Sequence, residues 1–295
     1  MLKRALIAHS NMVMIIMLGA GRAAKEIFRA ASRVIDYRLS SLFDSVSPLH
    51  KTFIQSEVPA FNYLCHIHLD KKVVYIELPK ASSSYVLTKL LEFVGTDTSN
   101  IRNVHKRSHS GLASPDSVGA RALSALLRDP ACFVFTVVRN PYLRAISCYC
   151  DKFLNTSIGD GSYISNLVMA ASKLYGFMAV PGRPLTWPEF VDFVVLTAPM
   201  KIDAHWTLQS DLLPQHSMTI HRIAKVETLA ADLVEIFTLL GADPVFLASL
   251  HTEHQRVSEI LMQSYLISPE VEKLRKVYAR DFEGFRYPTD IPGES

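Results

Sequence analysis

The sequence predicts an α/β fold of three layers, in which helices cover a mainly parallel sheet. Residues 132–138 form a continuous apolar run rich in β-branched and aromatic residues, which is typical of a strand buried on both faces of a parallel sheet. Residues 71–78 show a second strand pattern, and each run is followed by a short loop and a helical pattern. Strands that alternate with helices favour parallel pairing, because a parallel connection must cross over the sheet.

The length and composition are those of a globular protein. A chain of 295 residues is long enough for one large α/β domain or two small ones. Its hydrophobic content of 49% and charged content of 20% support a packed core and argue against disorder. The net charge of +3 is too small to indicate a nucleic-acid binder, so we expect no nucleic-acid partner.

The amino-terminal part differs from the rest of the chain. We expect residues 1–60 to form a helical lead-in and residues 61–295 to form a single domain. Polar residues interrupt the apolar stretch at residues 5–20, and the uninterrupted part, residues 12–20, is too short to span a bilayer. A buried or peripheral helix is therefore favoured, and membrane contact through residues 1–20 is the alternative.

The four cysteines have no metal-ligand spacing. Cys132 lies in the predicted buried strand, and Cys148 and Cys150 point to different sides of the helix that follows it. We expect reduced thiols and hence a reducing compartment. This predicts a cytoplasmic protein, with association to a membrane as the alternative.

The loop at residues 79–85 has the composition of an anion site. It carries Lys80 and three consecutive serines, and it precedes an amphipathic helical pattern that ends at Gly95. Amide groups at the start of a helix bind anions, and a lysine beside them adds a charge. A serine-rich helix cap is the alternative interpretation.

Two histidines lie in the next segment. Residues 101–109 are predicted to form a short strand and its exit loop, before a helix from Ser114 to Leu127. Because an imidazole titrates near neutral pH, His105 or His109 could accept a proton from a substrate. The alternative is a solvated basic loop.

Arg139 lies where the strand at residues 132–138 ends and the next helix begins. Asn140 can cap that helix and Pro141 suits its first position. Ligands usually bind at this edge of an open α/β sheet. The guanidinium group of Arg139 and the hydroxyl of Ser147, two helical turns later, could bind a phosphate. Pairing of Arg139 with a nearby carboxylate is the alternative.

The segment after this helix carries aromatic and basic side chains that would suit a sugar acceptor. Arg183, His205 and Trp206 are the candidates, and ordinary packing and surface charge are the alternative for each. Thr186 and Glu189 have the spacing of a capping box at the start of a further helix.

Five short motifs together resemble sulfotransferases that use 3′-phosphoadenosine 5′-phosphosulfate (PAPS). The stretch Arg139-Asn-Pro-Tyr-Leu-Arg144-Ala-Ile-Ser147 resembles the 3′-phosphate motif of that family, and Pro79-Lys-Ala-Ser-Ser-Ser-Tyr85 resembles its 5′-phosphosulfate loop. Residues 203–209, 219–232 and 277–287 are similar to three later motifs of the family's carbohydrate-specific members. The chain is identified by these motifs as a PAPS-dependent carbohydrate sulfotransferase of the family 2 type.

The resemblance implies a P-loop NTPase-like sulfotransferase fold with added helices and no metal. It implies transfer of a sulfuryl group from PAPS to a hydroxyl of a carbohydrate or glycolipid acceptor. The residues implied to bind the donor are Lys80, Ala81, Ser82, Ser83, Ser84, Tyr85, Arg139 and Ser147. The residues implied to act in catalysis are Lys80 and a histidine base, with His105 as first choice and His109 as second. The candidate acceptor contacts are Arg183, His205 and Trp206.

Two departures from the family pattern keep other functions open. Ser82 stands where many members have glycine or alanine, and Ala224 replaces a glycine. One alternative is a non-catalytic nucleotide-binding protein of the same fold. The other is a P-loop kinase-like phosphotransferase that would use ATP and Mg²⁺, although the Walker A pattern is absent.

Overall fold

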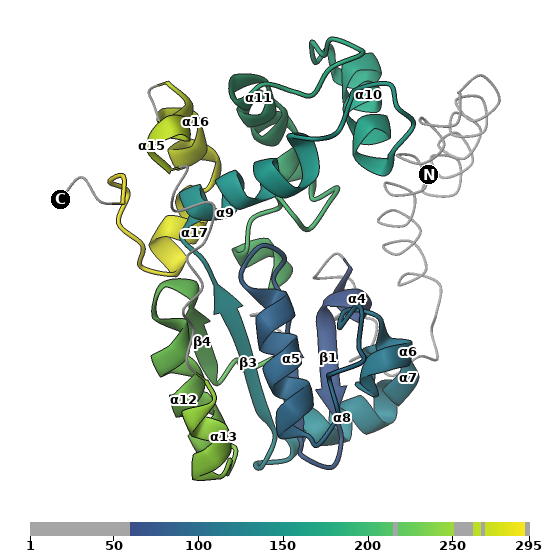
Figure 1. Ribbon diagram of the computed structural model, residues 1–295, viewed down its shortest axis with the longest axis vertical. Helices are drawn as coiled ribbons and strands as arrows, with labels where there is room; N and C mark the ends of the chain where they lie inside the picture. The colour runs from purple at the N-terminus through teal and green to yellow at the C-terminus, as the bar shows by residue number, and fades with distance from the viewer. Residues whose placement is uncertain (1–59, 215–217, 251–261, 267–268, 293–295) are drawn as a thin grey trace, which may run out of the picture.

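A four-stranded sheet forms the centre of the protein in the computed structural model, which describes residues 60–214, 218–250, 262–266 and 269–292. Its strands, in spatial order, are β1 (Cys65–His68), β2 (Val73–Ile76), β3 (Phe133–Val138) and β4 (Arg222–Lys225). β1 pairs with β2 in antiparallel fashion, while β2, β3 and β4 are parallel. The mainly parallel α/β sheet expected from the sequence is confirmed (Figure 1). The predicted lead-in at residues 1–60 lies almost entirely outside the described residues.

Helices lie around the sheet and at the end where its parallel strands finish (Figure 1). The helices within the described ranges are α4 (Phe61–Leu64), α5 (Ser83–Phe93), α6 (Arg107–Ser110), α7 (Pro115–Val118), α8 (Ala120–Arg128), α9 (Pro141–Cys148), α10 (Tyr163–Tyr175), α11 (Trp187–Thr197), α12 (Leu229–Leu239), α13 (Pro244–Ala248), α15 (Met262–Tyr265), α16 (Glu270–Val277) and α17 (Ala279–Gly284). A π-helical turn at Tyr149–Phe153 extends α9.

β1 and the segment after α5 differ from the sequence prediction. β1 was not predicted, because its four residues include two histidines and form no apolar run. The strand predicted within residues 101–109 is wrong, because turns and the short helix α6 occupy that segment. Ala113 instead covers the outer edge of β1 through two backbone hydrogen bonds with Ile67, of 3.0 and 2.8 Å.

The helix starts follow the predicted capping chemistry. The side chain of Asn140 accepts hydrogen bonds from the N–H groups of Tyr142 and Leu143 at the start of α9. The carboxylate of Glu189 accepts from the N–H and the hydroxyl of Thr186 at the start of α11. The helix predicted from Ser114 to Leu127 is divided into α7 and α8, since Gly119 adopts a φ of 81° between them.

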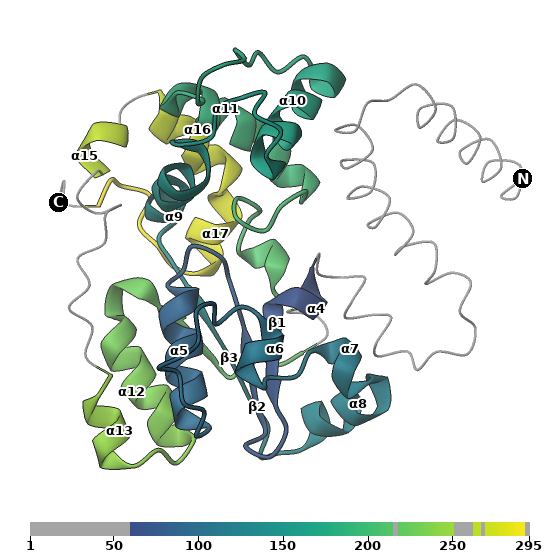
Figure 2. The ribbon, with the colours of Figure 1, turned by 45° about the vertical axis from the view of Figure 1, so that its right-hand side comes forward.

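Aromatic side chains join two helices to one face of the sheet. Phe237 of α12 lies 5.2 Å from Phe93 of α5 and 6.4 Å from Phe135 of β3, measured between ring centroids. The ring of Phe135 stacks in turn on Tyr75 of β2. α5 and α12 therefore lie side by side over the sheet, as both views show (Figures 1 and 2).

Helices α9, α11 and α16 gather at the carboxyl end of β3, where they form a second packed region above the sheet (Figure 2). The four cysteines are free thiols. In the described ranges, no helix is both long and apolar enough to cross a membrane.

Replacing Phe237 with alanine should destabilise the fold, because the fully buried ring bridges α5, α12 and the sheet. We expect a loss of about 3–5 kcal/mol in the free energy of unfolding, measured by urea denaturation. Val245→Ala on the neighbouring helix α13 is the matched control, because Val245 is 82% exposed and should change little. A loss below about 1 kcal/mol for Phe237→Ala would contradict this role.

Candidate active site

Two loops meet at the carboxyl edge of the sheet, one after β2 and one after β3. Because these strands are parallel neighbours, their outgoing loops lie next to each other. Nη1 of Arg139, at the end of β3, donates a hydrogen bond of 3.3 Å to the carbonyl oxygen of Lys80. The predicted anion loop and the predicted phosphate-binding arginine are thus in direct contact.

The loop at residues 79–85 turns sharply before α5 begins. Lys80 and Ser82 both adopt left-handed backbone conformations, with φ of 71° and 57°. Ser82 forms the amino-terminal boundary of α5, where glycine would adopt the same conformation without strain. Ala81 and Ser83 are buried, while Ser84 and Tyr85 are at least partly exposed. The first N–H groups of α5, which have no partner within the helix, lie in this turn.

Lys80 shares a carboxylate with a second lysine. Its Nζ lies 3.0 Å from Oδ2 of Asp151, and Nζ of Lys152 lies 3.1 Å from the same oxygen. Burial would raise the pKa of Asp151, but its contacts with both lysines lower it, so this carboxylate is ionised. Two cations therefore converge on one anion beside the loop. Lys152 was not among the predicted site residues.

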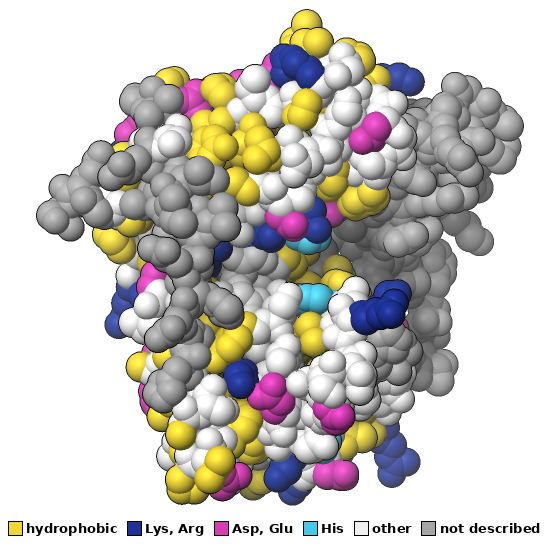
Figure 3. Space-filling model, in the orientation of Figure 1, with side chains coloured by type: hydrophobic (Ala, Val, Ile, Leu, Met, Phe, Trp, Pro, Cys, Tyr) yellow, Lys and Arg dark blue, Asp and Glu magenta, His cyan; other side chains and the backbone are white. Residues whose placement is uncertain are grey.

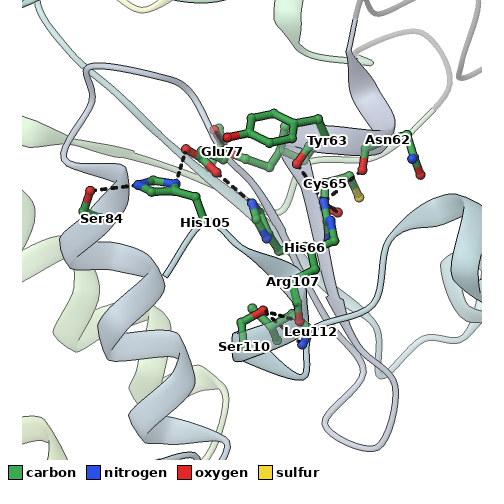
Figure 4. Close-up of polar contacts among 12 residues, drawn as sticks. Asn62, Tyr63, Cys65, His66, Glu77, Ser84, His105, Arg107, Ser110 and Leu112 are labelled. Atoms are coloured by element: carbon green, nitrogen blue, oxygen red, sulfur yellow. Dashed lines mark hydrogen bonds and ion pairs between the residues drawn. The ribbon is translucent and has the colours of Figure 1, made fainter. Parts of the chain in front are cut away.

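A row of polar side chains leads from the start of α5 into the sheet (Figure 4). Oγ of Ser84 lies 2.9 Å from Nε2 of His105. Nδ1 of His105 lies 2.9 Å from Oε1 of Glu77, and the other oxygen of Glu77 lies 2.8 Å from Nε2 of His66. The structure thus brings the predicted base His105 to the predicted anion loop. Glu77 and His66 were not predicted.

The protonation states of this row follow from its burial. Burial alone would raise the pKa of Glu77, but the contacts with His105 and His66 outweigh it and hold the pKa at about 2. Burial lowers the pKa of His66, so this imidazole is neutral at pH 7. An ionised carboxylate only accepts hydrogen bonds, so Nε2 of His66 carries the hydrogen that it donates to Glu77.

Arg107 has a structural role near this row. Its guanidinium group donates to the backbone carbonyls of Asn62, Tyr63, Cys65 and Ala113, at distances of 2.7 to 2.9 Å. It therefore joins α4, β1 and the chain after α6. His109 lies in α6, and its side chain is outside the described part of the protein, so its role stays a prediction.

The turn between β3 and α9 is held by two side chains from distant segments. Oε1 of Gln209 accepts from the N–H of Arg139, and Nε2 of Gln209 donates to its carbonyl, both at 2.9 Å. Glu227 accepts from the N–H of Asn140 at 2.9 Å. Arg139 is buried within this turn, and Ser147 lies partly buried further along α9.

Arg144, the second arginine of the motif after β3, also holds the backbone. It is buried and donates to the carbonyl oxygens of Pro79, Thr207 and Ala204, at 3.0, 2.7 and 2.6 Å. The motif at residues 203–209 is thereby attached to the loop after β2.

The three candidate acceptor contacts occupy different environments. Trp206 has no exposed surface, and its ring packs against Phe153 and Phe193. The prediction of an acceptor contact at Trp206 is therefore wrong, because a sugar cannot reach a fully buried side chain.

The other two candidates are partly exposed. Arg183 makes two hydrogen bonds with the carboxylate of Glu189, of 2.7 and 2.6 Å. Nδ1 of His205 lies 2.7 Å from Oδ1 of Asp203. Arg183 and His205 thus both have carboxylate partners within the chain, and their contact with an acceptor stays a prediction.

The surface of the protein is hollowed on one face. Figure 3 shows a hollow between the helices at the carboxyl edge and the lower part of the molecule, with histidine and basic side chains around it. Within the described residues, no group of three or more potential metal-ligating side chains was found.

Comparison with known proteins gives a consistent result. A family model described as the sulfotransferase family matches residues 66–288. Carbohydrate sulfotransferase 14 of Danio rerio is 22% identical over 291 residues, which cover 88% of this chain and 78% of that protein. Carbohydrate sulfotransferase 9 of Homo sapiens is 25% identical over 247 residues, covering 78% of this chain and 54% of that protein.

A further relative is carbohydrate sulfotransferase 8 of Mus musculus, 23% identical over 266 residues that cover 85% of this chain and 60% of that protein. The chain therefore spans less than two thirds of the length of two of these three relatives. No solved structure matches the chain significantly.

Acidification should destabilise the protein through His66. Because the pKa of folded His66 lies below its ordinary value of 6.5, the unfolded chain binds this proton more tightly. The contribution of neutral His66 to the stability of the fold is present above pH 6.5 and is lost as the pH falls below that value. Urea unfolding should show a smaller decrease from about pH 7 to about pH 5 for His66→Gln than for the wild type. Equal decreases in the two proteins would show that His66 does not contribute.

Proposed function

The chain belongs to the sulfotransferase family, and we propose that it transfers a sulfuryl group from PAPS to a hydroxyl of a carbohydrate or glycolipid acceptor. The observation that carries the proposal is the contact between Ser84 and His105, at 2.9 Å. It joins a side chain of the anion loop to a group that can accept a proton. The names of the relatives support a carbohydrate acceptor.

The arrangement of charges fits a nucleotide that is anionic at two positions. Arg139 is in contact with the main chain of Lys80, so cationic groups from two loops lie within the reach of one small ligand. We propose that Lys80 and the loop at residues 81–85 bind the 5′-phosphosulfate. Arg139 and Ser147 would bind the 3′-phosphate and so orient the donor.

Each group has a separate role in the proposed mechanism. The bound donor supplies the sulfuryl group and the 5′-phosphate that leaves. Lys80 and the first amides of α5 stabilise the negative charge that develops on the leaving side. His105 accepts the proton of the acceptor hydroxyl through Nε2, the nitrogen that now lies beside Ser84. Lys80 must exchange Asp151 for the donor, and Lys152 retains that carboxylate.

Two further proposals concern the chain as a whole. We propose that residues 61–295 form a single sulfotransferase domain with residues 1–60 as a lead-in. The four free thiols support a reducing compartment for the protein.

Lys80→Ala should lower kcat by more than it weakens nucleotide binding. The reason is that the 5′-phosphate carries more negative charge in the transition state than in the bound donor. We expect roughly a 10²–10³-fold decrease in kcat, measured with PAPS and a panel of sugar acceptors. Lys273→Ala on α16 is the control, since Lys273 pairs with Asp192 on the surface. An unchanged kcat in Lys80→Ala would remove this lysine from the mechanism.

Thermal unfolding with nucleotides tests the donor assignment. At ~100 times its dissociation constant, 3′-phosphoadenosine 5′-phosphate should add about 2.7 kcal/mol of stability, while AMP should add less. Arg139→Ala and Ser147→Ala should each reduce this preference. For Arg139→Ala we expect the binding free energy of the 3′-phosphorylated nucleotide to fall by about 1.5–3 kcal/mol, because charged hydrogen bonds are lost.

The outcomes of this measurement separate the alternatives. No stabilisation by the 3′-phosphorylated nucleotide, or a larger effect of ATP with Mg²⁺, would contradict the proposed donor and favour the kinase-like phosphotransferase or the non-catalytic protein. Stabilisation without turnover on any acceptor would favour a nucleotide-binding protein that is not an enzyme.

A further inference from the structure

We propose that Glu77 is a positioning residue for the base: its carboxylate holds Nδ1 of His105 and so directs Nε2 toward the acceptor hydroxyl. His66 supports this arrangement by holding the other oxygen of Glu77. The inference rests on the proposed function, because Glu77 would fix the orientation and the tautomer of the base in that reaction.

The geometry of the row supports this assignment. Glu77 directly follows β2, His66 lies in β1 and Ser84 lies in the first turn of α5, so three elements meet at His105 (Figure 4). The three successive contacts measure 2.8, 2.9 and 2.9 Å. Exposure increases along the row, from 4% for the side chain of Glu77 to 26% for that of His105. The carboxylate is therefore enclosed, whereas the imidazole reaches the surface.

The charge on Glu77 decides which nitrogen of His105 carries hydrogen. Nδ1 of His105 is buried and lies 2.9 Å from Oε1 of Glu77, and among the described residues it makes no other hydrogen bond. Because an ionised carboxylate has no hydrogen to donate, this close contact favours the tautomer with hydrogen on Nδ1. In the neutral imidazole this leaves Nε2 without hydrogen and able to accept a proton. A base that takes a proton from a hydroxyl needs this tautomer.

Ser84 marks the direction in which the acceptor hydroxyl would lie. Its hydroxyl is 2.9 Å from Nε2 of His105, and it donates if Nε2 carries no hydrogen. An acceptor hydroxyl in the same direction from Nε2 would lie beside the anion loop. During transfer, the O–H bond of the acceptor breaks and an N–H bond forms at Nε2. The acceptor oxygen bonds to sulfur as the bond from sulfur to the 5′-phosphate oxygen breaks.

The other groups around Glu77 do not replace this role. Its charge contributes to raising the pKa of Tyr63 and of Tyr75, after the larger effect of burial. Arg107 interacts with Glu77 electrostatically, but its guanidinium group already donates to four backbone carbonyls. A buried ionised carboxylate between two imidazoles is costly for folding and is a frequent feature of catalytic sites.

The tautomer of His105 can be measured in the wild-type protein by ¹⁵N NMR of the histidine rings. We expect hydrogen on Nδ1 and none on Nε2 near pH 8, and we expect Glu77→Gln to abolish this preference, because a carboxamide can donate as well as accept. Hydrogen on Nε2 of wild-type His105 would overturn the proposal. This readout requires neither turnover nor a variant that folds.

Kinetics test the same proposal in the working enzyme. Glu77→Gln should lower kcat/KM roughly 10²-fold through kcat, because an imidazole with hydrogen on Nε2 cannot take the proton of the acceptor hydroxyl there. Glu77→Asp should restore part of the rate. Glu92→Gln is the control, since Glu92 on α5 pairs with Lys89 outside the site. Stabilisation by 3′-phosphoadenosine 5′-phosphate should be the same in all variants.

The outcomes separate this inference from the proposed function. Retention of the Nδ1 tautomer of His105 in Glu77→Gln would overturn the positioning role, whatever the loss of rate. Failure of the wild type to bind the nucleotide or to transfer sulfate would contradict the proposed function instead, and the tautomer measurement would still test Glu77.

Discussion

The candidate site depends on the backbone turn that follows β3. A buried turn cannot bond to water, so each of its N–H and carbonyl groups needs a partner within the protein. Gln209 and Glu227 supply these partners, and both are themselves held. Asp281 accepts from the N–H of Gln209 at 2.7 Å, and the hydroxyl of Tyr287 donates to Glu227 at 2.7 Å. Segments far apart in the sequence thus determine the position of Arg139.

This network shows that several residues of the later motifs support the turn rather than the sheet. Trp206 and Tyr278 connect through a hydrogen bond of 2.9 Å from the tyrosine hydroxyl to the tryptophan carbonyl. Lys225 lies 4.4 Å from the ring centroid of Tyr287. A resemblance between motifs does not distinguish such supporting residues from those that take part in chemistry. Arg144 and Trp206 are examples, because only their burial and partners show that they hold the structure together.

Structural elements that have a strong local sequence pattern were predicted well. The apolar run that became β3 and the cap at Asn140 depend on neighbouring residues, so a short window of sequence contains the information. β1 was missed because four residues with two histidines give no periodic signal, and its pairing with β2 decides its conformation.

The role of Glu77 could not be predicted, because its partners His66 and His105 come from other elements. One signal was present, namely a single glutamate at the end of an otherwise apolar strand pattern. A carboxylate there must find partners when it is buried, and the sequence alone does not identify them.

The side chains that hold the turn at Arg139 also determine at what point during synthesis the protein can become active. The sheet strands and the anion loop leave the ribosome long before residues 281 and 287, yet those two side chains complete the support of the turn after β3. Contacts between residues so far apart in the sequence form late in folding. Closing the long loop between them costs chain entropy before the contacts can stabilise the structure. A nascent chain could therefore hold an ordered sheet while Arg139 is still unsupported. Translation itself would delay activity until Tyr287, which follows α17, has emerged.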